Sequence, residues 1–142
     1  MGHHSLQRAG EGALTAALPW LQVGAVALGA GAGGLARWRT GLWLDGRWGG
    51  FPFGTLLVNC VGGLLIGMAL AWFARIPNEL LRLLLVTGFL GGLTTFSSFS
   101  GESLALLQRG EYAIAFAHSA AHVIGSLALA TMGFWAIRSA AG

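Results

Sequence analysis

Thirteen charged residues divide this chain into four long stretches that carry no charge. The uncharged stretches cover residues 12–36, 48–74, 83–101 and 112–137. A transmembrane helix needs about 20 consecutive apolar residues, whereas a transmembrane barrel strand needs about half that number in alternating polarity. None of the four stretches alternates in polarity. The charge distribution therefore predicts an all-α membrane protein with four transmembrane helices joined by short loops.

The composition supports this class and disfavours several others. Hydrophobic residues make up 55% of the chain and charged residues 9%, whereas a soluble domain carries about 25% charged residues. The net charge of +3 comes from arginines at the ends of the apolar stretches rather than from a basic patch. Nucleic-acid binding and disorder are therefore disfavoured, and the single cysteine, Cys60, excludes an internal disulfide framework.

We expect one transmembrane domain over residues 1–142, of which residues 1–17 form an N-terminal extension. The expected helices cover about 18–38, 51–74, 80–108 with a break near 91–94, and 111–137. Pro19 fits the first turn of the first helix, because proline lacks the N–H that this turn leaves unpaired anyway. Trp20 beside it fits an anchor at the membrane interface.

Two Gly-x-x-x-Gly pairs lie in the first two stretches. They are formed by Gly29 with Gly33 and by Gly63 with Gly67. This spacing lets two helix backbones approach closely in a membrane, so we predict that these glycines pack helices together.

The arginines give no preferred orientation in the membrane. With four crossings, one side holds Arg8, Arg75, Arg82 and Arg138, and the other holds Arg37, Arg39, Arg47 and Arg109. Topology is normally set by an excess of positive charge in cytoplasmic loops. The even count leaves two interpretations: an uncounted feature orients the chain, or copies insert both ways and pair as an antiparallel homodimer, like the inverted repeats of transporters.

The third stretch is unusually polar, because five of the seven residues from Thr94 to Ser100 carry hydroxyls. The Gly91-Gly92 pair lies near its midpoint and is the expected position of a helix break. A break frees backbone carbonyls, which suit a cation, and N–H groups, which suit an anion. Helix packing is the alternative role for the glycine pair, but the crowding of polar groups favours an ion pathway.

Aromatic and amide side chains accompany these hydroxyls. Phe96 and Phe99 are three residues apart and share one helix face, and the positively polarised edge of an aromatic ring can receive an anion. Asn59 is the only side-chain amide in the second stretch. Its two N–H donors suit either an anion or a bond to a neighbouring helix.

The fourth stretch places His118, His122 and Ser126 on one helical stripe. Two histidines four residues apart can bind zinc, but no third ligand lies nearby in the sequence, so a metal site is disfavoured. A polar track along a pore, with a possible pH-sensitive role for the histidines, is the preferred interpretation.

Three blocks of this sequence resemble the CrcB/Fluc family of fluoride channels. They are the glycine-rich run 29–37, the run 52–59 followed by Gly62, and the run 88–100 followed by Glu102. The third block is the most specific. The chain departs from the family pattern at His118 and His122, where the family usually has Tyr and Ser, and at Gly63, where it often has Ser.

The resemblance implies a dual-topology antiparallel homodimer with two fluoride pores in a bacterial inner membrane. It implies that Asn59 lines the pore and that Phe96 and Phe99 supply ring edges. It also implies that the carbonyls of Gly91 and Thr94 from both chains bind one central, structural Na⁺. The full set of expected pathway residues is Asn59, Phe96, Ser97, Ser98, Phe99, His118, His122 and Ser126.

The expected function is passive, selective efflux of fluoride from the cytoplasm, with the ion, Na⁺, lipid and a second copy of the chain as partners. A proton-coupled multidrug exporter is the main alternative, but it requires an intramembrane carboxylate, which the four stretches lack. A membrane assembly subunit that transports nothing is the third candidate. An enzyme is disfavoured, because no nucleophile, base and orienting acid can be assembled within the membrane.

Overall fold

The computed structural model describes the backbone of residues 3–45 and 51–140, and the side chains of residues 19–45 and 51–140. All regular elements in these ranges are helical, which confirms the predicted all-α class. They are α1 (His3–Leu44), α2 (Phe53–Phe73), α3 (Glu79–Arg82), η1 (Leu83–Leu90), α4 (Gly91–Leu93), α5 (Phe96–Gln108) and α6 (Tyr112–Ala140).

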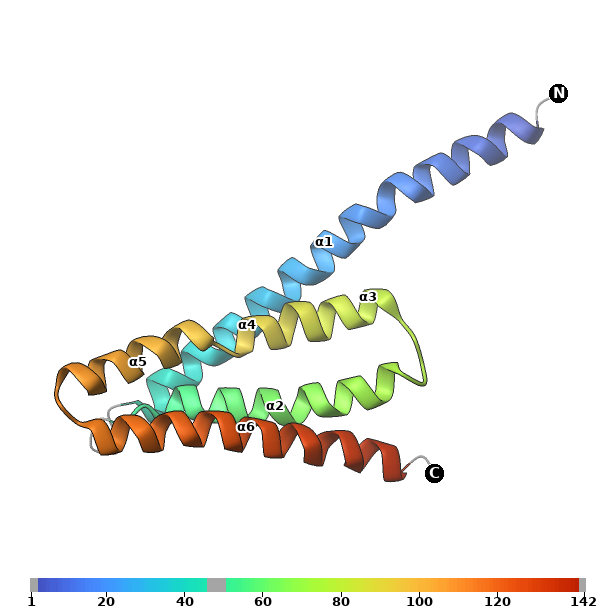
Figure 1. Ribbon diagram of the computed structural model, residues 1–142. Helices are drawn as coiled ribbons and strands as arrows, with labels where there is room; N and C mark the ends of the chain where they lie inside the picture. The colour runs from blue at the N-terminus through green and yellow to red at the C-terminus, as the bar shows by residue number, and fades with distance from the viewer. Residues whose placement is uncertain (1–2, 46–50, 141–142) are drawn as a thin grey trace.

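The segments α3, η1, α4 and α5 follow one another along one line and together form the third helix of the bundle (Figure 1). α2 and α6 lie side by side and run parallel to each other, and the third helix runs antiparallel to both (Figure 1). α1 packs mainly against η1 and α4. The third helix is therefore held between α1 on one side and the α2–α6 pair on the other.

Three helical segments are long and apolar enough to cross a membrane: Phe53–Phe73, Glu79–Gln108 and Tyr112–Ala140. The protein is thus a multi-pass membrane protein. α1 is not among the three, and its described part carries glycines, which contribute little hydropathy, at 24, 29, 31, 33, 34 and 41.

α1 is longer than the expected range 18–38. Pro19 lies inside the helix rather than in its first turn. Five of the six residues directly before Pro19 are alanine or leucine, which are among the strongest helix formers, so the helical backbone continues on the N-terminal side of the proline.

The predicted packing role of the Gly-x-x-x-Gly pairs is confirmed. A Cβ on Gly29 or Gly33 would collide with the backbone of the third helix, and a Cβ on Gly63 or Gly67 would collide with the backbone of α6. Helices approach this closely only where both sides present small residues or bare backbone. The glycines therefore fix the spacing of α1 against the third helix and of α2 against α6.

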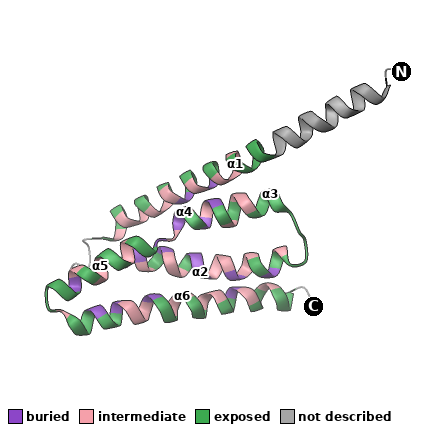
Figure 2. Ribbon diagram, turned by 45° about the horizontal axis from the view of Figure 1, so that its top comes forward, coloured by how far each residue is buried: buried purple, intermediate pink, exposed green. Residues whose placement is uncertain are grey.

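The interior is small and most large apolar side chains face outward. The described core centres on Val58, Leu90 and Leu93. Figure 2 shows buried residues along the inward faces of the helices and exposed residues along their outer faces. Leu28, Phe116 and Leu127 are at least two-thirds exposed in the single chain. An apolar outer surface of this extent is expected where lipid or a second chain covers it.

Candidate functional site

The third helix is interrupted at Thr94 and Thr95, at the end of the expected break region 91–94 rather than at the Gly91-Gly92 pair itself. Both threonines have extended backbones, with ψ of 155° and 121°. The Gly91-Gly92 pair remains helical, and a Cβ on Gly92 would collide with the backbone of Ala30, so this glycine serves close packing against α1. Threonine is β-branched and is a favoured N-cap residue, so Thr95 suits the start of α5.

The break withdraws two backbone donors from their helical partners. In a continuous helix the Thr95 N–H would bond to the Gly91 carbonyl and the Ser98 N–H to the Thr94 carbonyl. Instead, Thr95 N–H donates to Asn59 Oδ1 at 2.8 Å, and Ser98 N–H donates to Thr95 Oγ1 at 3.1 Å. The carbonyls of Gly91 and Thr94 therefore lose the donors that a helix would give them.

Asn59 on α2 holds the break open from outside the third helix. Its Oδ1 accepts from Thr95 N–H, while its Nδ2 donates to the Thr95 carbonyl at 3.0 Å. The second Nδ2 hydrogen is directed to Nδ1 of His122 on α6 at 3.2 Å. Both amide hydrogens are thus engaged by the protein, so Asn59 makes the helix-to-helix bonds that were one of its two expected roles.

These contacts determine which ring nitrogen of His122 carries the proton. Because the amide presents an N–H to His122, the ring must accept at Nδ1, and a neutral imidazole then carries its proton on Nε2. His122 is only 5% exposed, and its Nε2 has no hydrogen-bond partner among the described residues. The site therefore contains a buried N–H donor that is free to bind another group.

A second polar cluster lies one helical turn away and is centred on Glu102 of α5. Glu102 Oε1 accepts from Thr55 Oγ1 on α2 at 2.5 Å, and Oε2 lies 3.3 Å from His118 Nε2 on α6. The other ring nitrogen of His118 lies 3.2 Å from Ser103 Oγ. His118 is fully buried, so the carboxylate and the imidazole satisfy each other where water has no access to the ring.

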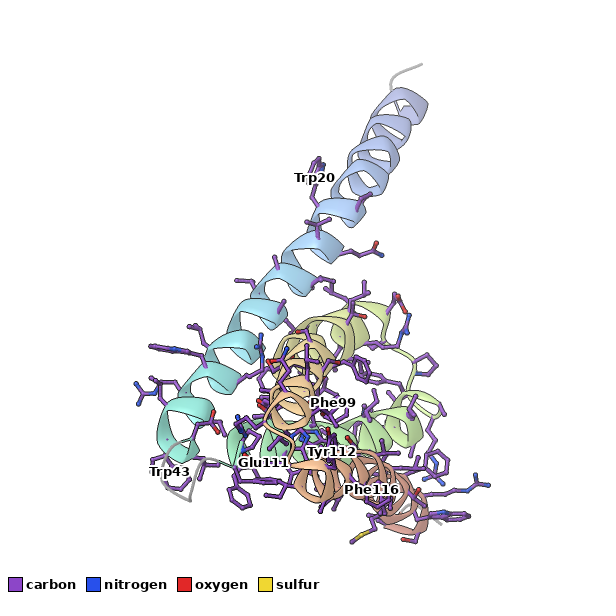
Figure 3. The ribbon with its side chains drawn as sticks, turned by 60° about the vertical axis from the view of Figure 1, so that its left-hand side comes forward. Trp20, Trp43, Phe99, Glu111, Tyr112 and Phe116 are labelled. Atoms are coloured by element: carbon purple, nitrogen blue, oxygen red, sulfur yellow. The ribbon has the colours of Figure 1, made fainter. Side chains whose placement is uncertain are left out.

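The ring of Phe99 joins the two clusters. It stacks on His118 with 5.4 Å between ring centroids and 16° between planes, and it lies 4.7 Å from His122. Phe96 continues the aromatic row at 5.3 Å from Phe99. Figure 3 shows Phe99 among the helices, whereas Phe116 projects from α6.

Two cavities are lined by the residues of this region, and the aromatic row borders the first of them. The first cavity is lined by Asn59, Thr94, Thr95, Phe96, Phe99, His122 and Ser126, together with small and aliphatic residues. The second cavity is lined by Arg37, Asp45, Thr55, Ser98 and Glu102, among others. The polar cluster of Glu102, His118 and His122 lies between them, since Glu102 borders one cavity and His122 the other.

The structure brings most of the expected pathway residues together. Asn59, Phe96, Phe99, His122 and Ser126 border the first cavity, and Ser98 borders the second. His118 is fully buried and borders neither cavity. Ser97 borders neither of the two, and its hydroxyl lies 3.1 Å from Thr95 Oγ1. Its contribution is to the N-terminal turn of α5.

The premises of two sequence expectations overlooked Glu102. A metal site was disfavoured for want of a third ligand, yet Glu102 lies with His118 and His122 in a group whose donor atoms are within 4.8 Å of one another. An intramembrane carboxylate was also thought absent, but Glu102 falls inside the segment Glu79–Gln108. Glu102 and His118 both lie eight residues from Gly110, and residues equally distant from a tight antiparallel turn lie opposite each other.

Arg37 is the other site residue that local sequence patterns missed. Its Nε donates to the Gly92 carbonyl at 3.0 Å, next to the break. A continuous helix would direct the Phe96 N–H to this carbonyl. An arginine at the end of an apolar stretch is usually an interfacial residue, and only the packing of α1 against α4 places it here.

Comparison with known proteins agrees with this architecture. The family described as CrcB-like protein, Camphor Resistance (CrcB) matches residues 24–134. A protein of Bordetella petrii named fluoride-specific ion channel FluC is 53% identical over 111 residues, which cover 77% of this chain and 85% of that protein.

Proteins of the same name from two further bacteria are similar to the chain. The protein of Aromatoleum aromaticum is 52% identical over 78% of this chain and 86% of its own length. The protein of Pseudomonas aeruginosa is 48% identical over 83% of this chain and 94% of its own length. The residues that match the family, 24–134, include the break and the lining of both cavities. The chain therefore belongs to the CrcB family.

Proposed function

We propose that this protein is a fluoride-selective channel that lets fluoride leave the cytoplasm passively across a bacterial inner membrane and so confers fluoride resistance. The family relationship and the shared name of the curated relatives support this function. A membrane potential that is negative inside drives an anion outward with about 2.3 kcal/mol per charge per 100 mV. Passive efflux therefore needs neither a pump nor a catalytic step.

The observation that carries this proposal in the structure is the buried, unpartnered Nε2–H of His122 on the first cavity. A small anion leaves its hydration shell only where other donors replace water. The N–H of His122 and the ring edges of Phe96 and Phe99 offer positive polarity without a fixed positive charge. Such a site binds an anion weakly enough to release it, and a narrow path of this kind disfavours larger chloride.

In this proposal Asn59 is a positioning residue. Both of its N–H groups are bonded to Thr95 and His122, so it orients the His122 ring and keeps the His122 proton on Nε2. The third helix presents Phe96 and Phe99 beside that ring because Asn59 also satisfies the backbone at the break.

We propose further that α1 is a fourth crossing and that two copies of the chain pair in opposite orientations. The even distribution of arginines between the two sides supports dual topology. The outward apolar side chains of the single chain provide surface for a partner. An antiparallel pair has two equivalent pathways, one for each copy of the break.

The carbonyls of Gly91 and Thr94 fit a structural Na⁺ at the centre of this dimer. Their helical donors are bonded elsewhere, and a hard cation prefers oxygen ligands of this type. A bound Na⁺ would supply positive charge that offsets the carbonyl dipoles of four such oxygens, two from each chain. Exchange of Na⁺ for a large organic cation should then shift the detergent-solubilised dimer toward monomer in size-exclusion chromatography.

The function is tested by purifying the protein into liposomes loaded with potassium fluoride. A potassium ionophore is added, and a fluoride electrode records the release. We expect rapid fluoride release, and negligible chloride release from chloride-loaded vesicles. An absence of fluoride release from folded dimer would refute the channel function.

A pair of variants tests the pathway itself. Phe96 and Phe116 are equally exposed in the single chain, at 78%, but only Phe96 borders the first cavity. We expect Phe96→Leu to slow fluoride release strongly, because leucine has no polarised ring edge. Phe116→Leu on α6 serves as the control and should leave release unchanged.

A further inference from the structure

Glu102, His118 and His122 form a compact set of side chains that can also ligate a metal ion, a role that fluoride conduction does not use. One donor atom from each residue lies within 4.8 Å of the other two. Donor atoms on one tetrahedral zinc ion lie about 3.4 Å apart, as follows from zinc–ligand distances of about 2.1 Å. Small side-chain rotations would therefore bring the three donors onto one ion.

The partners of these side chains resemble the outer shell of a metal centre. A metal-bound histidine usually engages its other ring nitrogen in a hydrogen bond, and a ligating carboxylate is usually hydrogen-bonded as well. Here the Nδ1 atom of His118 faces Ser103 Oγ, and Glu102 accepts from Thr55. The Nε2 atom of His118 and the second carboxylate oxygen of Glu102 then point toward each other.

His122 provides the independent sign that a ligand is missing. It is 95% buried, yet its Nε2 atom has no partner among the described residues. A metal ion at Nε2 would need the lone pair there, so the remaining ring proton would move to Nδ1. The Nδ1–H would then face an N–H of Asn59, and the Asn59–His122 hydrogen bond would be lost.

The charges along the entry route admit a cation. The second cavity carries one guanidinium, Arg37, against the two carboxylates of Asp45 and Glu102. Glu102 is 24% exposed and borders this cavity, whereas His118 is fully buried behind it. An ion that enters from this side meets the carboxylate first and the two imidazoles next.

We propose that Glu102, His118 and His122 form an inhibitory site for a borderline divalent transition-metal ion such as Zn²⁺. Two neutral imidazoles and one carboxylate bind the ion and leave a fourth position for water or an anion. The bound ion leaves a net charge of +1 in the pathway, which traps an anion instead of passing it on. It also breaks the Asn59–His122 bond that orients the free N–H donor. The inhibition rests on the proposed channel function, but the binding of the metal does not.

Binding is tested first, on detergent-solubilised protein and without any transport. His3 and His4 are replaced by alanine in every sample, because two adjacent histidines bind zinc by themselves. Calorimetric titration with Zn²⁺ should show one ion per chain. Glu102→Gln and His118→Asn should each weaken binding at least about tenfold. Glu111→Gln makes the same chemical change as Glu102→Gln at a carboxylate paired only with Arg109 and should leave binding unchanged.

X-ray absorption at the zinc edge gives a test that needs no substitution within the site. The parent protein should show two imidazole ligands and oxygen ligands on each zinc ion. A spectrum with fewer than two imidazoles would overturn the site, as would binding that survives both substitutions in folded protein.

Inhibition is tested in the fluoride-loaded liposomes. Micromolar Zn²⁺ should slow fluoride release at least tenfold, and a chelator should restore it. If zinc binds at the site but release continues at the original rate, the inhibitory role is wrong. If no fluoride is released even without zinc, the channel function fails while the metal site stands on its binding data.

Discussion

The substitution Gly33→Ala measures how closely α1 must approach the third helix. A Cβ at position 33 would lie 2.7 Å from the Leu93 nitrogen and still closer to the Phe89 carbonyl oxygen, whereas ordinary contacts begin at 3.4 Å. Both atoms belong to the backbone and cannot rotate away. α1 and the third helix must therefore separate by at least about 0.7 Å, the difference between 2.7 Å and 3.4 Å.

The separation of the two helices also affects the hydrogen bond beside the break. Arg37 lies one helical turn beyond Gly33, and its Nε bonds to the Gly92 carbonyl at 3.0 Å. A shift of this size carries the bond beyond normal hydrogen-bond length. Overpacking costs about 1–3 kcal/mol and the lost hydrogen bond about 1 kcal/mol. We expect a total cost of about 2–4 kcal/mol in the free energy of unfolding.

The neighbouring residue supplies the control. A Cβ on Gly34 would meet nothing within 4 Å, and Gly34→Ala brings the same gain in helix propensity as Gly33→Ala. Equilibrium unfolding in mixed micelles with increasing SDS, followed by tryptophan fluorescence at one protein concentration, gives the difference between the two variants. A difference below about 0.5 kcal/mol would refute the close approach of these backbones.

Three further outcomes follow from contacts described above. Thr55→Val removes the hydroxyl that donates to Glu102 and should lower the free energy of unfolding by about 1.5–3 kcal/mol in the SDS titration, because that is the worth of a hydrogen bond to a charged group. Thr131→Val removes a hydroxyl that bonds to a carbonyl of its own helix and should match the parent. Ser139→Cys, made in a Cys60→Ser background, tests the orientation of the chain in sealed cells. An impermeant maleimide should label half of the chains, since dual topology places residue 139 on both sides of the membrane. Labelling of all chains or of none would exclude dual topology. Glu79→Gln breaks an ion pair whose two side chains are about half exposed and should leave the midpoint of the SDS titration where it is in the parent, because an exposed ion pair contributes little to stability. A clearly lower midpoint would contradict a solvated pair.

Features that depend on one segment at a time could be predicted from the sequence. The lengths of the apolar stretches gave the positions of α2, the third helix and α6, because a crossing helix needs a continuous apolar run. The spacing of Gly29 with Gly33 and of Gly63 with Gly67 gave two helix contacts, because a bare backbone face follows directly from a four-residue repeat.

Features that depend on two segments were predicted less well. The break falls at Thr94 and Thr95 because Asn59, from another helix, bonds to the Thr95 backbone. Glycine content alone therefore identified the wrong pair. Glu102 was missed because its partners Thr55 and His118 lie 47 and 16 residues away. The α5–α6 turn at Gly110 was the available signal, since it sets residues 102 and 118 opposite each other.

The amide of Asn59 has a consequence for how the chain enters the membrane. The break frees backbone N–H and C=O groups from their helical partners, and lipid provides no hydrogen-bond partner for them. Each such group left unpaired in the hydrocarbon region costs several kcal/mol. The partner that satisfies Thr95 lies on α2, which precedes the third helix along the chain. During synthesis α2 emerges from the ribosome first. We therefore expect the segment Glu79–Gln108 to enter the lipid paired with α2, so that its insertion depends on α2 being in the membrane already.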